Sequence, residues 1–223
     1  MKKEDLSTQQ YLKILDCITQ ALMKNGLKAT TMDSIASDLQ MSKRTLYEIF
    51  GTKEEMFREA LQYFNKKMSD KLSEIFNSSQ NIMEGIIKCF LFNRDIIGQL
   101  SPEFMRDMEV VANQKNMYST SHRRMHYQNL YEVLQKGVKQ GFFREDLNLM
   151  VQCRLFHLQL EALKRTEELF PEDISLMNVI DNIIIGFLRG ISSYKGLEEI
   201  EKYMPSFSNL SESIQNQNDK KFI

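Results

Sequence analysis

Hydrophobic residues recur every three or four positions along most of the chain, which is the spacing of one face of an α-helix. The first such face covers residues 11–22, and Gly26 follows it as a helix stop signal. Two short amphipathic segments come next, over residues 31–39 and 42–50, and a longer one follows Thr52. Because no segment alternates apolar and polar residues convincingly, the pattern predicts an all-α protein.

Local capping signals predict where these helices begin. Thr30 or Thr31 is expected to cap the first short helix and Ser42 the second, since a hydroxyl oxygen can accept from the free amides of a first turn. The sequence from Thr52 to Glu55 matches a capping box at the start of the long helix.

The rest of the chain predicts further helices and a polar tail. The expected helices are residues 82–97, one that begins after Ser101-Pro102, about 117–140, one capped by Asp146 that runs to about Leu169, and one from Pro171 and Asp173 to about Tyr194. The run Ile183–Ile185 has strand propensity, but its neighbours keep a helical period, so we expect a helix there as well.

The charge balance limits the class of partner. The 223 residues carry a net charge of −1, so the chain as a whole is not a polybasic nucleic-acid binder. Residues 1–68 contain eleven Lys and Arg against nine Asp and Glu, and the remainder contains 18 against 21. Any role in DNA binding must therefore depend on local geometry.

Cysteine usage and hydropathy bear on location. Cys17, Cys89 and Cys153 are isolated and match no metal-binding spacing, which fits a reducing compartment. The first residues lack the apolar stretch of a signal peptide, and the densest apolar run, 183–188, is far shorter than the ~20 residues that span a bilayer. We expect a cytoplasmic protein with no membrane contact.

Residues 31–50 have the layout of two short helices that can place the second one in a major groove of DNA. Their inward positions are apolar, and Ala36 is small enough for close helix crossing. The outward positions of the second segment are Lys43, Arg44, Thr45, Tyr47 and Glu48. On periodicity alone, a plain helical hairpin with a solvated charged face explains the same segment.

The residues of this segment resemble the DNA-binding domain of TetR-family repressors. The matching positions are Gly26, Thr31-Met32, Ile35-Ala36, Ser42, Thr45-Leu46-Tyr47, Phe50 and Lys53-Glu54. The resemblance is strong over residues 8–68 and weaker beyond, where residues 141–147 resemble a junction before a long helix. Gln40 departs from the pattern because the family usually has Gly in this turn, so we expect either a positive φ there with some strain or a slightly different turn.

The resemblance implies a repressor that binds a palindromic operator in double-stranded DNA as a homodimer, and that a small hydrophobic or amphipathic ligand releases. By position, it implies that Thr31, Tyr47 and Lys53 touch phosphates. It places Ser42, Lys43, Arg44 and Thr45 at the DNA surface as well. Arg44 is the first choice for reading a base, because arginine suits the O6/N7 edge of guanine.

The expected domains follow from this reading. Residues 1–52 form a three-helix DNA-binding domain with its helix-turn-helix at 31–50, residues 53–204 form a helical regulatory and dimerisation domain, and residues 205–223 form a polar tail. Residues 148–194 are apolar on more than one face and so need a second surface to bury against.

Two residue sets are proposed within the regulatory domain. The dimer interface is expected to include Leu155, Leu158, Ile180, Ile184, Phe187 and Ile191. The ligand pocket is expected to draw on Met68, Leu72, Met83, Phe90, Met105, Met108, Met125 and Phe156, although ordinary core packing explains any one of them.

Other classes of function have weaker support. No nucleophile elbow, phosphate loop or pair of catalytic carboxylates is present, so we expect no enzymatic activity, no catalytic residue and no cofactor. His122 and His126 share a helix face, but adjacent arginines argue against a metal site. The alternatives are a helical ligand- or protein-binding module, and a DNA binder that acts constitutively or as an activator.

Overall fold

The computed structural model describes residues 5–114, 120–163, 169–171 and 174–204, and it leaves out the side chains of 109–114 and 120–127. These ranges contain ten helices and no strand, apart from an isolated bridge between Phe143 and Ser192. The all-α prediction is confirmed. The tail after residue 204 and the side chain of Met125 lie outside the described part of the chain.

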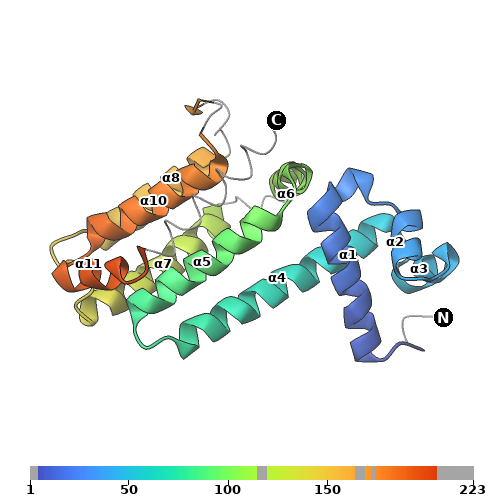
Figure 1. Ribbon diagram of the computed structural model, residues 1–223, viewed down its shortest axis with the longest axis horizontal. Helices are drawn as coiled ribbons and strands as arrows, with labels where there is room; N and C mark the ends of the chain where they lie inside the picture. The colour runs from blue at the N-terminus through green and yellow to red at the C-terminus, as the bar shows by residue number, and fades with distance from the viewer. Residues whose placement is uncertain (1–4, 115–119, 164–168, 172–173, 205–223) are drawn as a thin grey trace, which may run out of the picture. The chain divides into compact units, whose positions relative to one another are not determined.

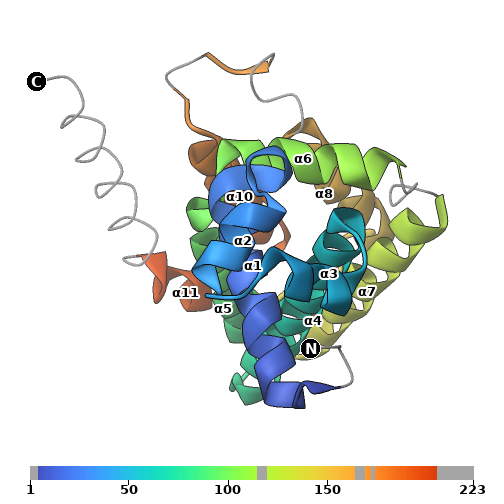
Figure 2. The ribbon, with the colours of Figure 1, turned by 90° about the vertical axis from the view of Figure 1, so that its right-hand side faces the viewer.

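The first of two compact units comprises residues 5–74 and 95–114 of the described chain. It holds α1 (Thr8–Ala29), α2 (Met32–Asp38), α3 (Lys43–Phe50), most of α4 (Lys53–Ser78), the end of α5 (Ile82–Gln99) and α6 (Pro102–Gln114). α2 contacts both α1 and α3, as Figure 2 shows. One apolar cluster holds these helices together, and Ile18, Ile35, Leu46 and Met56 are fully buried in it.

The second unit comprises the described residues within 75–94 and 119–204. It holds the first part of α5, α7 (Thr120–Lys139), α8 (Leu149–Ala162), α10 (Leu176–Ile191) and α11 (Tyr194–Glu201). α8 packs against α7 and α10, and in Figure 1 it lies largely behind α10. Met83, Ile87, Leu134 and Phe143 are fully buried here. The predicted division at residue 52 concerns function and stays a prediction.

Two predicted helix boundaries in the second unit are wrong. Asn148, not Asp146, caps α8, because the Asp146 carboxylate is held by the Arg144 guanidinium at 2.6 and 3.0 Å. The expected helix to Tyr194 ends at Ile191, and Ser193 caps a separate helix, α11.

Other boundaries agree more closely with the sequence pattern. Ser101 caps α6 by accepting from the Phe104 amide at 3.1 Å, with Pro102 as the first helical residue, as predicted. The apolar run at 183–185 is helical. Within the described residues, no helix is both long and apolar enough to cross a membrane.

Candidate DNA-binding site

α2 begins at a reciprocal cap. The Thr31 hydroxyl oxygen accepts from the Ser34 amide at 3.1 Å, and the Ser34 hydroxyl oxygen accepts from the Thr31 amide at 3.0 Å. Thr30 instead lies buried and donates its hydroxyl to the Gly26 carbonyl at 2.7 Å. Of the two threonines that the sequence offered, Thr31 therefore caps the helix and remains exposed.

The turn between α2 and α3 depends on a left-handed residue. Gln40 has a φ of 53°, which is the first of the two alternatives that the sequence left open, and it is the one non-glycine residue with positive φ in the described chain. The amides of Gln40 and Met41 donate to the Ser37 and Ala36 carbonyls at 3.0 and 2.9 Å and close α2. Ser42 then caps α3 by accepting from the Thr45 amide at 3.0 Å.

The inward faces of the two helices form part of the apolar cluster. Ile35 and Leu46 have no exposed surface, and Ala36 and Phe50 are also buried. This packing fixes the rotation of α3 about its own axis, because turning the helix would expose Leu46. The opposite face of α3 must consequently point outward.

The outward face of α3 carries the predicted polar residues. Lys43, Arg44, Tyr47 and Glu48 are exposed, while Thr45 is half-buried, its hydroxyl 2.7 Å from that of Ser42. The Arg44 side chain is 88% exposed, more than any other cation that forms an ion pair in the described chain. A face of this kind can donate to base edges and phosphates.

Both cations of α3 have a carboxylate partner. The Lys43 ammonium lies 2.8 Å from Asp33 in the first turn of α2, and the Arg44 Nε lies 2.9 Å from Glu48 one turn further along α3. The hydrogen bond that the Lys43 ammonium donates to the Asp33 carboxylate raises the pKa of Lys43. The pattern of outward positions did not reveal these pairings.

The start of α4 places Lys53 next to the motif. Gly51 ends α3 with a φ of +79°, which few side chains tolerate. The Thr52 hydroxyl oxygen accepts from the Glu55 amide at 3.1 Å, but the Thr52 amide donates to the Phe50 carbonyl, so only half of the predicted capping box forms. The Lys53 ammonium lies 5.1 Å from the Phe57 ring centroid.

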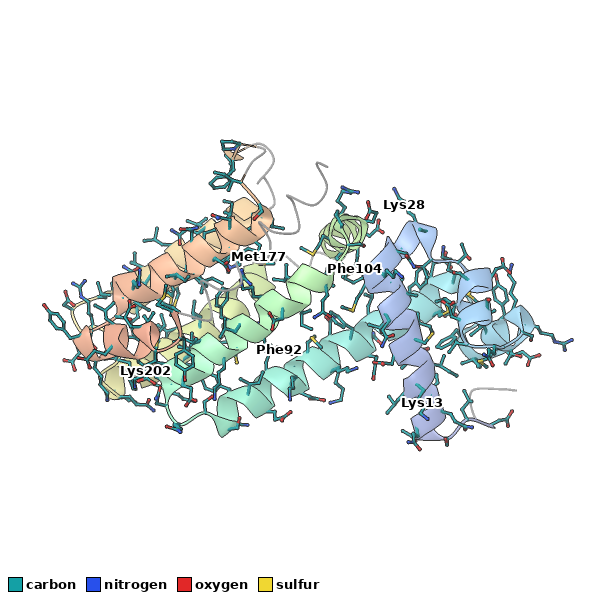
Figure 3. The ribbon with its side chains drawn as sticks, viewed as in Figure 1. Lys13, Lys28, Phe92, Phe104, Met177 and Lys202 are labelled. Atoms are coloured by element: carbon teal, nitrogen blue, oxygen red, sulfur yellow. The ribbon has the colours of Figure 1, made fainter. Side chains whose placement is uncertain are left out.

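A junction between α1 and α6 within the first unit was not predicted. α1 is interrupted at Gly26, whose φ is +77°, and the next amide, that of Leu27, donates to the Asp107 carboxylate of α6 at 2.7 Å. The Ser101 amide also donates to the Met23 carbonyl at 2.9 Å. Phe104 is buried at the same contact between α6 and α1 (Figure 3). α6 is thereby fixed to the helix that supports the motif.

The predicted pocket residues are divided between the two units. Met83 and Phe90 are buried in the second unit, where Phe156 stacks on Phe187 with centroids 4.2 Å apart. Those in the first unit are less enclosed: Met68 and Leu72 on α4 are half-buried, Met108 packs against the apolar cluster, and Met105 is 36% exposed. The pocket as a single site remains a prediction.

The predicted dimer residues differ in how much of their side chains is exposed. Leu155 and Leu158 on α8 are 50% and 62% exposed. Ile180 and Ile191 on α10 are buried within the single chain at 5% and 1%, so they offer a partner almost no surface. Ile184 and Phe187 are half-buried.

The second unit also contains a buried ion pair and a buried thiol. The Arg94 guanidinium on α5 donates to both oxygens of Asp181 on α10, at 2.7 and 2.8 Å, and its side chain is 5% exposed. Burial raises the pKa of the fully buried Cys153 to about 11, so this thiol is protonated and unreactive at neutral pH.

Comparison with known proteins identifies similar chains. Residues 14–60 match the family described as "Bacterial regulatory proteins, tetR family". The HTH-type transcriptional repressor KstR2 of Mycobacterium tuberculosis is 25% identical over 141 residues, which cover 61% of this chain and 70% of that protein.

Solved structures share the fold. The structure of the M. tuberculosis ketosteroid transcriptional regulator KstR2 superposes with a TM-score of 0.51 at 20% identity, covering 84% of this chain and 97% of that one. A putative transcriptional regulator from Saccharomonospora viridis, solved in complex with choline, has a TM-score of 0.58 at 18% identity and covers 84% and 100%.

Proposed function

Since this chain is a member of the TetR family of bacterial regulators, proteins that bind DNA to control transcription, we propose that it represses its genes as a homodimer on a palindromic operator and that a small molecule releases it. The main support is the motif at 31–50. It consists of two capped helices, of which the second buries Leu46 and exposes Lys43, Arg44 and Tyr47.

In this proposal α3 enters a major groove, and the residues of the motif have different roles. Arg44, on the outer face, reads a guanine through its guanidinium, because that group can bond both acceptors on the guanine edge. Thr31, Tyr47 and Lys53 bind phosphates on either side of the groove, while Ser42, Lys43 and Thr45 meet the DNA at the start of α3, where free amides favour an anion.

The homodimer is proposed to form through α8 and α10. Val151, Leu155 and Leu158 follow one another at four- and three-residue steps on α8 and are 46%, 50% and 62% exposed. An exposed apolar stripe of this kind is typical of a surface that a partner covers. Two helices from each subunit would make a four-helix interface under two-fold symmetry. Two-fold symmetry in turn matches a palindrome with half-sites roughly 34–36 Å apart or somewhat more.

The releasing ligand is proposed to be apolar or amphipathic and to bind among Met83, Phe90 and Phe156 in the second unit. One structural neighbour was solved with choline, a small and partly apolar molecule. The name of another includes ketosteroid, a class of small and mainly apolar molecules. α4 and α5 each continue from one unit into the other, so a shift of either helix would be transmitted along it as a rigid body.

The DNA-binding part of the proposal is tested by recovering the genomic fragments that the purified protein retains and measuring its affinity for them. We expect one or a few sites with two-fold symmetry, bound far more tightly than random duplex of the same length. Affinity that is equal for recovered and random duplexes would contradict an operator-specific function.

The dimer is tested with Leu158→Glu, which places a charge in the proposed interface. We expect sedimentation equilibrium at micromolar concentration to show a dimer for the natural protein and a monomer for this variant. Leu12→Glu is the matched control, because Leu12 on α1 is also an exposed leucine, at 41%. A natural protein that sediments as a monomer, or an equal effect of both substitutions, would refute the interface.

A further inference from the structure

The motif that is proposed to meet DNA carries more negative than positive side chains. Residues 31–50 contain Asp33, Asp38 and Glu48 but only Lys43 and Arg44 as cations. DNA is a polyanion, and non-specific affinity for it comes from cations that neutralise phosphates and release counterions. A recognition motif of this composition should therefore bind arbitrary DNA weakly.

Two of these carboxylates also form ion pairs with the two cations. The Asp33 carboxylate is 2.8 Å from the Lys43 ammonium, and the Glu48 carboxylate is 2.9 Å from the Arg44 Nε. Asp33 belongs to α2 and Lys43 to α3, so the first pair spans the turn between the helices, whereas the second lies along α3. Each cation of the motif thus has an acidic partner before DNA arrives.

These pairs contribute little to the stability of the fold. The side chains of Lys43 and Asp33 are 48% and 71% exposed, and water screens ion pairs at such positions. The Arg44 side chain is still more exposed. A pair that stabilises the free protein only slightly can be exchanged for another partner at little cost, and DNA supplies such partners.

From these observations we propose that Asp33 and Glu48 determine specificity by competing with DNA for Lys43 and Arg44. The inference rests on the proposed function, in which this face of α3 meets DNA. On arbitrary DNA, a phosphate must draw each cation away from its carboxylate, and the loss of that ion pair offsets part of the new phosphate contact. On the operator, a bidentate bond from Arg44 to guanine offsets that loss.

The carboxylates act on the two kinds of DNA unequally, and this difference is the source of discrimination. Glu48 is further favoured on the operator if a cytosine amino group donates to it, which is the base contact that glutamate makes best. No phosphate can donate to a carboxylate in this way. Asp33 and Glu48 consequently lower affinity for random duplex more than affinity for the operator.

The test uses the full chain with Asp33→Asn and Glu48→Gln, which remove the charge and keep the shape. The probes are a random-sequence duplex and a duplex that the natural protein selects from a random pool. We expect each substitution to raise affinity for random duplex about three- to tenfold and for the selected duplex by less than about twofold. The salt dependence on random duplex should steepen by about one to two per dimer.

Two controls isolate the competition. Asp70→Asn removes the carboxylate of a comparable exposed pair, in which Lys66 lies 3.0 Å from Asp70 outside the motif, and it should change neither affinity. In a background that already carries Arg44→Ala, Glu48→Gln should no longer raise affinity for random duplex. A gain that persists there would mean that Glu48 repels phosphates directly, and it would overturn the competition.

The remaining outcomes separate this inference from the proposed function. If the natural protein selects no duplex and Arg44→Ala changes nothing, the DNA-binding face itself is wrong. If the natural protein selects a duplex and needs Arg44 for it, while Asp33→Asn and Glu48→Gln bind random duplex as the natural protein does, only the competition is refuted. Unchanged thermal unfolding curves show that each variant is folded.

Discussion

Arg44 on α3 and Arg94 on α5 each donate to a carboxylate, at 2.9 and 2.7 Å, but their surroundings are opposite. The Arg44 side chain is 88% exposed and bonds to a residue one turn away on its own helix. The Arg94 side chain is 5% exposed and grips both oxygens of Asp181, 87 residues further along the chain. Similar bonds therefore form a solvent-exposed pair within α3 in one region and a buried link between α5 and α10 in the other.

The difference shows that burial decides what an ion pair does. In the exposed pair, water compensates either ion when the partner leaves, so the pair is free to open for a new ligand. In the buried pair, the Arg94 side chain is 5% exposed, so water cannot replace the Asp181 carboxylate, and removing that carboxylate carries a large cost. Asp107, half-buried and bonded to the Leu27 amide at 2.7 Å, lies between these extremes.

The largest effect is expected from breaking the buried pair. Asp181→Ala leaves the Arg94 guanidinium inside the second unit without its carboxylate, and it should lower the free energy of unfolding by about 3–5 kcal/mol. Urea denaturation measures the change. Asp146→Ala is the control, because Asp146 pairs with Arg144 on the surface, and its loss should not shift the curve measurably.

A double substitution sharpens this prediction. Replacing both ions by apolar residues, as in Arg94→Met with Asp181→Leu, should recover most of the lost stability, since neither charge of the pair then remains. If Asp181→Ala proves as mild as Asp146→Ala, the contrast between the buried and exposed pairs does not hold.

The next effect concerns DNA affinity and not stability. Arg44→Ala should cost about 1–3 kcal/mol on the operator and relax the preference at one base pair in each half-site. Lys53→Ala should instead weaken binding to all sequences similarly and reduce the salt slope by roughly one per subunit. Fluorescence anisotropy across a set of single-base operator variants distinguishes the two. Identical profiles for both variants would show that neither residue reads bases.

Asp107 should give an intermediate loss of stability. Asp107→Ala removes a charge-assisted acceptor from a half-buried amide and should lower the free energy of unfolding by about 1–2 kcal/mol. Asp107→Asn keeps an acceptor and should lose less. Hydrogen exchange at the Leu27 amide provides a direct check: unchanged protection in Asp107→Ala would mean that the bond is not important for this junction.

The smallest effect is expected for the exposed pair in the absence of DNA. Glu48→Gln should leave the urea midpoint of the free protein unchanged within error, because Arg44 is already solvated. The same variant is expected to change DNA discrimination, so an effect on binding without one on stability would confirm that this pair is exchangeable. A clear loss of stability would mean that the Arg44–Glu48 pair stabilises the fold as the buried pair does.

The sequence predicted the motif well because its signals are local. Thr31 and Ser42 each accept from an amide three residues further along the chain, and the structure shows both in the expected capping roles. Gln40 stands out in the sequence only because the family pattern has Gly in this turn. Its φ of 53° shows that the turn needs a left-handed residue whichever side chain is present.

The missed features depend on partners that are distant in the chain. The bonds from Arg94 to Asp181 and from Leu27 to Asp107 join residues 87 and 80 positions apart, and no periodicity links them. The sequence predicts Asp146 as a helix cap because aspartate is common at that position, but the Arg144 guanidinium, two residues away, binds its carboxylate instead. The inward rotation of Ile180 and Ile191 likewise depends on which neighbours α10 packs against.

The rate at which Cys153 is alkylated can report how often the second unit opens. Its side chain has no exposed surface and its pKa is about 11, so an alkylating reagent can reach the thiolate only in molecules whose second unit has transiently opened. Replacing Cys17 and Cys89 by serine would leave this thiol as the single site of modification. The rate at which mass spectrometry detects its alkylation then counts opening events in the native population, and any molecule that binds among the surrounding helices must slow that rate in proportion to its occupancy.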